Sequence, residues 1–220
     1  MILCVESVLT PEDIAEARAA LAQARWRDGR RTAGWNARPV KHNEQCDSTD
    51  RAAQALAARL LPRVESHPLF AAAVRPQVFG PVFFNRYAAG MTYGAHVDDA
   101  LMGGVRTDVS FTLFLDDPAD YDGGDLVIDT SAGEYAYKLP PGGLLIYPST
   151  TLHRVEPVTR GERRALVGWA QSHVRSAERR ELLFDLDRAR RALFEREGKT
   201  PELDLLSKCQ ANLLRMWAQD

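Results

Sequence analysis

The residues with the clearest chemical potential are two histidines and an aspartate in the second half of the chain. His96 and Asp98 are two positions apart in the segment YAAGMTYGAHVDDALM. In a β-strand this spacing directs both side chains to the same face, where an imidazole and a carboxylate can bind one cation. A third ligand is available in His153, which follows an apolar, strand-like segment at residues 144–147.

Two histidines and one carboxylate predict a metal centre with open coordination positions. This ligand set is typical of non-haem Fe(II) oxygenases, whereas closed structural zinc sites use four protein ligands. An isolated HxD pair also occurs often by chance, so it does not establish a metal site by itself. The prediction therefore depends on His153 and on an arginine that follows it.

That arginine is Arg163, which lies ten residues after His153 at the start of the next expected strand. If the strand runs antiparallel after the turn PVTRGE, its alternation places Arg163 on the same face as Val167 and Trp169. An arginine on an apolar face needs an anion, and its planar fork suits the distal carboxylate of 2-oxoglutarate. The alternative is that Arg163, or its neighbour Arg164, only pairs with an acidic side chain at the surface.

These residues lie in a β-rich region between residues 77 and 171. Short apolar segments alternate there with turns, and they include QVFGPVFFNRY, VSFTLFL, DLVI, LLIYP and RALVGWAQS. Short strands joined by turns such as DDPADYDGG and LPPGG favour a sandwich or barrel over a parallel sheet with crossover helices. We therefore predict a jelly roll, mainly β with flanking helices.

Two helices are expected before the β-rich region. Thr10 and Pro11 form a helix-start signal, and the apolar positions that follow predict a helix that ends near Trp26. A second helix is expected from residues 48–50 until Pro62, because proline interrupts helical hydrogen bonding. Both helices are expected to flank the sheet.

The C-terminal residues return to a helical pattern. One helix is expected to end before Gly198 and to bury a stripe made of Leu182, Leu183, Leu186, Ala189, Leu193 and Phe194. Thr200 and Pro201 begin a last helix that carries Leu206, Cys209, Leu213 and Trp217. We therefore divide the chain into a jelly-roll domain with N-terminal helices at residues 1–176 and a C-terminal helical module at residues 177–220.

Composition and charge restrict the partners. The 220 residues carry a formal net charge of −2, which gives no indication of nucleic-acid binding. No apolar segment approaches the roughly 20 residues that cross a bilayer, and no secretion signal is recognisable, so a cytoplasmic location without membrane association is expected. The dispersed cysteines indicate neither a disulfide framework nor a zinc knuckle; they are Cys4, Cys46 and Cys209.

Longer segments of the chain resemble a known family. They are DGRRTAGWNARPVKHNEQ, FNRYAAGMTYGAHVDDALM, RTDVSFTLFLDDPADYDGGDLVI, KLPPGGLLIYPSTTLHRVEPVTRGERRA, LLFDLDRA and NLLRMWA. Together they resemble the bacterial PKHD-type hydroxylases, a branch of the prolyl 4-hydroxylase-like Fe(II)- and 2-oxoglutarate-dependent dioxygenases with a double-stranded β-helix core. The chain departs from the family pattern at His42, at Asp99 and in KCQANLL, and these departures leave the implied metal ligands intact.

The resemblance implies roles for individual residues of this chain. The implied iron ligands are His96, Asp98 and His153. The residues implied to bind 2-oxoglutarate are Arg163 and Tyr87. Tyr93 is implied to lie nearer the open face of the metal, close to the substrate.

The implied reaction is a hydroxylation that consumes O₂ and 2-oxoglutarate and releases succinate and CO₂, with Fe(II) as the metal and ascorbate as a candidate reductant. The acceptor stays open between a peptide side chain, a free amino acid and a siderophore-like metabolite, in line with a family link to bacterial iron uptake. A homo-oligomer is a candidate assembly. Two alternatives lack this reaction: a cupin-like isomerase or hydrolase that uses the triad without redox chemistry, and a non-catalytic sensor of iron and 2-oxoglutarate.

Overall fold

A computed structural model describes residues 1–219, and its helices precede and follow the β-rich region along the chain. Among these residues the α-helices are α1 (Pro11–Ala22), α2 (Arg51–Ser66), α3 (Pro68–Val74), α4 (Ala177–Glu197) and α5 (Pro201–Trp217), and 3₁₀ turns occur at Gly29–Thr32, Arg38–Val40 and Pro118–Asp120. α1 begins as predicted, because Thr10 and Asp13 exchange hydrogen bonds between side chain and backbone and Pro11 follows the cap. It ends at Ala22 instead of near Trp26, because Trp26 begins a strand that pairs with a neighbouring strand.

The prediction that Pro62 ends the second helix is wrong. α2 continues through Pro62, which is exposed to solvent, and ends at Ser66. The additional turn places Val64 in the core, in helical register with the buried Leu60. The burial of Val64 therefore offsets the one backbone hydrogen bond that proline cannot donate.

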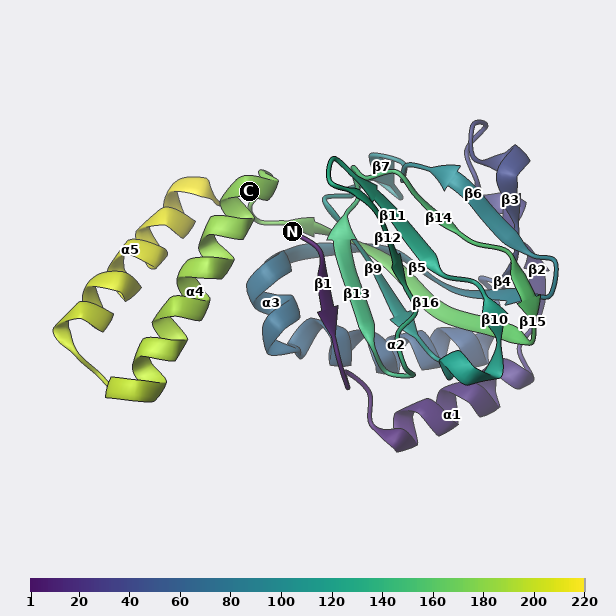
Figure 1. The fold of residues 1–220 in the computed structure, drawn as a ribbon, viewed down its shortest axis with the longest axis horizontal. Coiled ribbons are helices and arrows are strands. Elements are labelled where there is room, and N and C mark those ends of the chain that lie inside the picture. The colour runs from purple at the N-terminus through teal and green to yellow at the C-terminus, as the bar shows by residue number, and fades with distance from the viewer. Residues whose placement is uncertain (220) are drawn as a thin grey trace.

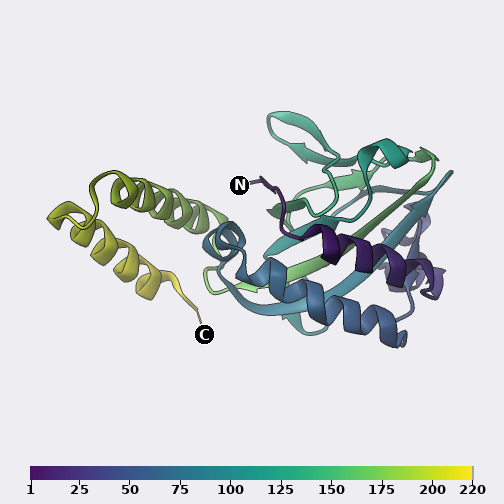
Figure 2. The same cartoon turned by 90° about the horizontal axis from the view of Figure 1, so that it is seen from below.

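The larger sheet carries helices on one of its faces. Within residues 1–219 its strands are, in spatial order, β1 (Leu3–Val5), β13 (Leu144–Pro148), β9 (Val109–Phe114), β16 (Glu162–Ser172), β5 (Pro76–Ala88), β4 (Glu44–Cys46) and β2 (Trp26–Asp28). Along β13, Leu144 and Ile146 belong to the core shared with α1, α2 and α3, whereas Leu145 and Tyr147 face the other side. Figures 1 and 2 show α1 and α2 side by side along this helical face.

A smaller sheet covers the opposite face. Its strands are β12 (Gly133–Tyr137), β11 (Leu126–Thr130), β14 (His153–Val155), β6 (Thr92–His96) and β3 (Lys41–His42), and two short pairs accompany it, β10 (Asp122–Gly123) with β15 (Val158–Arg160) and β7 (Leu101–Met102) with β8 (Val105–Arg106). A second apolar cluster joins Tyr87 and Phe114 of the larger sheet to Ile128 and Val155 of the smaller one. The described strands pair antiparallel throughout, so the chain forms a double-layered β sandwich, as predicted.

The last two helices form a hairpin that projects away from the sandwich (Figure 1). Phe184 of α4 joins the core between the larger sheet and the helices. At the root of the hairpin, where α4 begins, Nη1 of Arg180 donates to the backbone carbonyls of Val174 and Arg175, each at 2.8 Å. None of the helices in the described part of the chain is long and apolar enough to cross a membrane.

The predicted apolar stripes of the hairpin are only partly buried. Leu183 is buried as predicted, but Leu182 and Phe194 of α4 are 59% and 56% exposed. Cys209 of α5 is also exposed, and α5 buries Leu203 instead. Because each helix of a projecting hairpin has few neighbours besides its partner helix, apolar residues on the flanks of the stripe stay in contact with solvent.

Candidate metal and cosubstrate site

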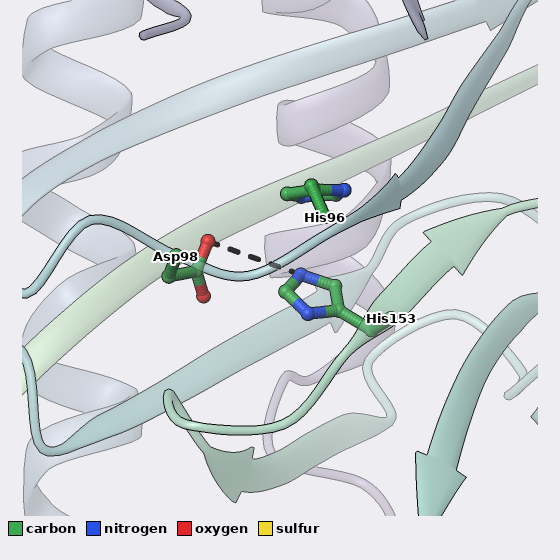
Figure 3. Close-up of side chains that lie close together, drawn as sticks. All are labelled: His96, Asp98 and His153. Carbon is green, nitrogen blue, oxygen red and sulfur yellow. Dashed lines mark ion pairs between the residues drawn. The ribbon is translucent and has the colours of Figure 1, made fainter. Parts of the chain in front are cut away.

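Three candidate metal ligands converge where two strands of the smaller sheet pair. His96 ends β6 and His153 begins β14, and these residues are direct partners in the antiparallel register. Asp98 follows two residues after β6, and one potential ligand atom of each side chain lies within 4.8 Å of the other two. Figure 3 shows this cluster, in which Nε2 of His153 is 3.8 Å from Oδ1 of Asp98.

The strand alternation that we expected for Asp98 does not place it. β6 ends at His96, and residues 97–99 lie outside any strand. Asp98 is instead held by Ser110 of β9, whose hydroxyl donates to Oδ2 at 2.6 Å and lies 2.8 Å from Oγ of Ser149. The larger sheet therefore orients this carboxylate, and Oδ1 stays directed at the histidines.

Both histidines are oriented through Nδ1. In His96 this nitrogen lies 2.8 Å from the carbonyl oxygen of Gly94, and in His153 it lies 3.1 Å from that of Thr151. A carbonyl oxygen accepts only from a protonated nitrogen, so these contacts favour the tautomer with hydrogen on Nδ1 and a free lone pair on Nε2. That arrangement is the usual one for metal-binding histidines.

The surroundings of His96 favour its neutral form. Burial of the ring lowers the pKa of His96, and the neighbouring His153 lowers it further. The His96 ring stacks on Tyr93, with ring centroids 3.6 Å apart and an angle of 16° between the planes. Two imidazoles with their Nε2 atoms free and one carboxylate fit a divalent transition metal that keeps positions for other ligands.

A cavity of about 360 Å³ connects this cluster with the other residues singled out in the sequence. The candidate residues that line it are His96, Asp98, His153, Arg163, Tyr87 and Tyr93. They come from both sheets, and the segment at residues 32–37 contributes to the wall. The volume and the few convergent polar groups are typical of a small-molecule site.

Arg163 is a buried cation whose hydrogen bonds are incomplete. It is only 1% exposed, and its Nε and Nη2 have no hydrogen-bond partner among residues 1–219. Its guanidinium carbon lies 5.3 Å from the ring centroid of Tyr87 and 5.1 Å from that of Phe114. A buried charge without acceptors is unfavourable, so this position fits an anionic ligand.

The neighbouring Arg164 makes the ion pair that the sequence left open for either arginine. Its Nη2 donates to Oδ1 of Asp116 at 2.6 Å, and its backbone N–H donates to the same carboxylate. One face of β16 lines the cavity with Arg163, Val167 and Trp169. Leu166 on the other face packs into the core beneath the helices, so the predicted register of this strand is confirmed.

Tyr87 and Gly124 support Arg163 from two sides. Tyr87 on β5 is the register partner of Arg163, and burial raises its pKa to about 12, so its phenol keeps a proton to donate. Gly124 has a φ of +68°, and a side chain there would bring Cβ to 3.1 Å from Cδ of Arg163. Glycine at this turn therefore permits the close approach of backbone and guanidinium.

Two residues of the site were not found from the sequence. Ser110 lies in a strand that is buried along its whole length, and only the structure shows its contact with Asp98. Lys41 lines the cavity from the short strand β3, where no spacing links it to the metal cluster. The one signal for Lys41 was its charge in a segment that also resembles the family.

The chain is similar to known oxygenases in sequence. The family model described as the 2OG-Fe(II) oxygenase superfamily matches residues 82–171, and the one described as the PKHD-type hydroxylase C-terminal domain matches residues 178–219. A PKHD-type hydroxylase of Acaryochloris marina is 52% identical over 219 residues, which cover 100% of both chains. The chain belongs to the PKHD-type hydroxylase family. A second PKHD-type hydroxylase, from Picosynechococcus, is 50% identical over 100% of both chains.

The solved structures show the same fold. A prolyl-4-hydroxylase of Pseudomonas putida superimposes with a TM-score of 0.53 at 23% identity, covering 78% of this chain and 92% of that one. The predicted jelly roll is therefore confirmed. As a PKHD-type hydroxylase, the chain is a 2-oxoglutarate-dependent dioxygenase that uses Fe(II), which sets aside the non-redox isomerase and the non-catalytic sensor.

Proposed function

We propose that this dioxygenase hydroxylates a C–H bond of a substrate that enters the cavity, and that it converts 2-oxoglutarate to succinate and CO₂ in the same reaction. The observation that carries the proposal is that the metal cluster and Arg163, whose Nε and Nη2 have no partner among residues 1–219, line one cavity. A 2-oxo acid bound at the metal by one end and at Arg163 by the other uses both features.

The proposed iron ligands are His96, Asp98 and His153. When bound, Fe(II) supplies the activation of O₂ that hydroxylation of a C–H bond requires. The protein orients the ligands: the carbonyls of Gly94 and Thr151 hold the two imidazoles, and Ser110 holds the carboxylate. Because the protein supplies three ligands, coordination positions remain for the cosubstrate and for O₂.

Arg163 and Tyr87 are the proposed partners of the distal carboxylate. The two free nitrogens of Arg163 match a carboxylate in a bidentate arrangement, and the phenol of Tyr87 can donate a further hydrogen bond. Phe114 beside the guanidinium excludes water from this end of the cavity. Exclusion of water strengthens the charged pair.

Tyr93 is the proposed boundary between the metal and the substrate. Its ring stacks on His96 and lines the cavity, so a substrate placed over the metal contacts it. Burial raises the pKa of Tyr93, and the carboxylates of Asp98 and Asp99 raise it further. The phenol therefore stays protonated and can position a substrate group by hydrogen bonding.

The test is incorporation of isotopically labelled oxygen. The protein is loaded with Fe(II) and 2-oxoglutarate without oxygen, mixed with a bacterial metabolite and peptide extract, and exposed to labelled O₂. We expect a species that gains one labelled oxygen atom, with succinate formed in equal amount, and no such species with Asp98→Ala. Absence of both labelled product and succinate with the wild-type protein would contradict the proposed function.

A further inference from the structure

Lys41 is a second buried cation of the cavity wall, and it has no ion-pair partner among residues 1–219. It is 6% exposed and lines the same cavity as the metal cluster. Its Nζ donates to Oγ1 of Thr32 at 3.1 Å, and no carboxylate oxygen within residues 1–219 lies within salt-bridge distance of it. An ammonium carries three N–H donors, so donors remain for another acceptor.

The acidic residues nearest to Lys41 are engaged elsewhere. Oδ2 of Asp98 accepts from Ser110, and its Oδ1 faces the metal cluster. Asp28 accepts hydrogen bonds from the side chain of Arg30. Burial lowers the pKa of Lys41 to about 8, and the charges of Asp98 and Asp28 only partly oppose this effect. The ammonium therefore stays charged near neutral pH in a place where a further anion would stabilise it.

Lys41 and Arg163 approach the cavity from different sheets. Lys41 lies on β3, at the edge of the smaller sheet, whereas Arg163 lies on β16 of the larger sheet. Nζ of Lys41 is 4.9 Å from the ring centroid of Tyr93, and the same ring stacks on His96. The ammonium and the ring of His96 thus both contact Tyr93. Because Arg163 serves the distal carboxylate of 2-oxoglutarate, Lys41 is free for a different anion.

The cavity opens to solvent beside apolar side chains, and its wall includes Thr32, which contacts Lys41. Val97 and Leu101 line the cavity and are nevertheless 47% and 68% exposed, so they mark its mouth. Trp35, which is 88% exposed, lies in the wall-forming segment at residues 32–37. A molecule entering here meets apolar side chains at the rim and the ammonium of Lys41 inside.

We propose that Lys41 binds a carboxylate of the substrate and so selects substrates in which a carboxylate stands next to an apolar group. The proposal rests on the proposed function, since it assigns the substrate of the same site. Thr32 fixes the ammonium, and its hydroxyl in turn lies 2.6 Å from Oε1 of Gln45. The remaining N–H donors of Lys41 then meet the substrate carboxylate near the metal.

The experiment measures binding of two probes of equal shape, benzoate and the neutral benzamide. The full chain is loaded with Zn(II), which is redox-inert, and with saturating 2-oxoglutarate, so that Arg163 is occupied. By calorimetry we expect benzoate to bind at least about tenfold more tightly than benzamide, since a hydrogen bond to a charged group has this magnitude. Lys41→Met is expected to remove the preference while 2-oxoglutarate affinity and melting temperature stay unchanged.

Lys138→Met is the matched control. Nζ of Lys138 also lies over a tyrosine, 4.0 Å from the ring centroid of Tyr121, but Lys138 does not line the cavity. Its replacement is expected to leave the preference for benzoate intact. If Lys41→Met melts at a lower temperature, Lys41→Gln removes the charge with a side chain that can still contact Thr32, and it is expected to lose the preference as well.

Three results would overturn the proposal. They are equal affinity of the wild-type protein for benzoate and benzamide, a preference retained in folded Lys41→Met or Lys41→Gln, and loss of 2-oxoglutarate affinity in a variant with unchanged melting temperature. The last result would assign Lys41 to the cosubstrate. Because these measurements involve no turnover, they are independent of oxygen incorporation, and failure of the labelling experiment would leave a confirmed carboxylate site at Lys41.

Discussion

The cavity and the root of the C-terminal hairpin each bury an arginine, but only one of these arginines has its partners within the described chain. Arg180 donates to two backbone carbonyls, whereas Arg163 leaves Nε and Nη2 without an acceptor among residues 1–219. A buried polar group with complete hydrogen bonds stabilises the fold. One with incomplete bonds is unfavourable for stability and indicates a ligand. Burial alone therefore does not separate structural arginines from binding ones.

The same difference holds for the buried aspartates of the two regions. Asp187 in the hairpin accepts from Arg190 and Gln210 through Oδ1 and from Arg191 through Oδ2. Asp98 in the cavity accepts from Ser110 through Oδ2, and its Oδ1 faces His153. Both carboxylate oxygens of Asp187 are thus engaged within the hairpin, whereas Oδ1 of Asp98 is directed at the other candidate metal ligands.

The largest effect is expected from loss of a metal ligand. Asp98→Ala, His96→Ala and His153→Ala are each expected to abolish iron-dependent succinate formation in a folded protein, because no neighbouring group replaces the lost bond. Asp187→Ala is the control: it removes a carboxylate whose side chain is 7% exposed, against 6% for Asp98, and we expect a lower melting temperature with turnover retained at moderate temperature. Asp98→Ala with undiminished activity and iron content would reject the ligand assignment.

The next largest effect is expected at Arg163. Arg163→Met removes a charged partner of the proposed cosubstrate, which typically costs about 2–5 kcal/mol, or roughly 30-fold or more in 2-oxoglutarate affinity. Calorimetric titration of the metal-loaded protein measures this affinity. Without 2-oxoglutarate, the melting temperature is expected to stay the same or to rise, because an unpaired buried charge is lost.

Arg164→Met tests the register of the same strand. This residue pairs with Asp116 outside the cavity, so 2-oxoglutarate affinity is expected to change little. A silent Arg163 and a sensitive Arg164 would show that the strand is shifted by one residue. If neither variant changes the affinity, these residues do not bind the cosubstrate.

The parts of the site that could be predicted are those encoded locally. His96 and Asp98 are close in sequence, and the residue types around Arg163 follow the alternation of one strand. Ser110 was missed because its partner Asp98 lies in a distant loop that follows β6, and a serine inside a buried strand gives no sign of this contact.

The fold shows the same limit. The jelly roll and the helix starts follow from short-range patterns, such as the cap at Thr10. The passage of α2 through Pro62 depends on the tertiary burial of Val64, and the exposure of Leu182 depends on how few elements surround the hairpin. Both outcomes are decided by packing between distant segments, which local propensity does not contain.

A smaller effect is expected at Ser110. Ser110→Ala removes the hydroxyl that orients Asp98, and a support of this kind contributes about tenfold to metal affinity. Competition with a chelator measures the affinity. Ser149→Ala, which removes only the hydroxyl next to Ser110, is expected to have a weaker effect. Equal metal affinity in wild type and Ser110→Ala would show that Asp98 needs no support from the larger sheet.

The smallest effect on the site is expected from Arg180→Met, although Arg180 is buried like Arg163. The carbonyls of Val174 and Arg175 lose their donor, and an unpaired buried acceptor costs about 1–3 kcal/mol. For a chain of this size that corresponds to a fall in melting temperature of roughly 2–4 °C per kcal/mol. Affinity for 2-oxoglutarate is expected to stay unchanged, because α4 contributes no residue to the cavity wall.

Opposite outcomes are therefore expected for the two methionine variants. Arg163→Met loses ligand affinity without losing stability, and Arg180→Met loses stability without losing ligand affinity. If both variants lowered the melting temperature and neither changed the affinity, the missing hydrogen bonds of Arg163 would reflect its packing in the fold, and the contrast between the two regions would no longer indicate a ligand.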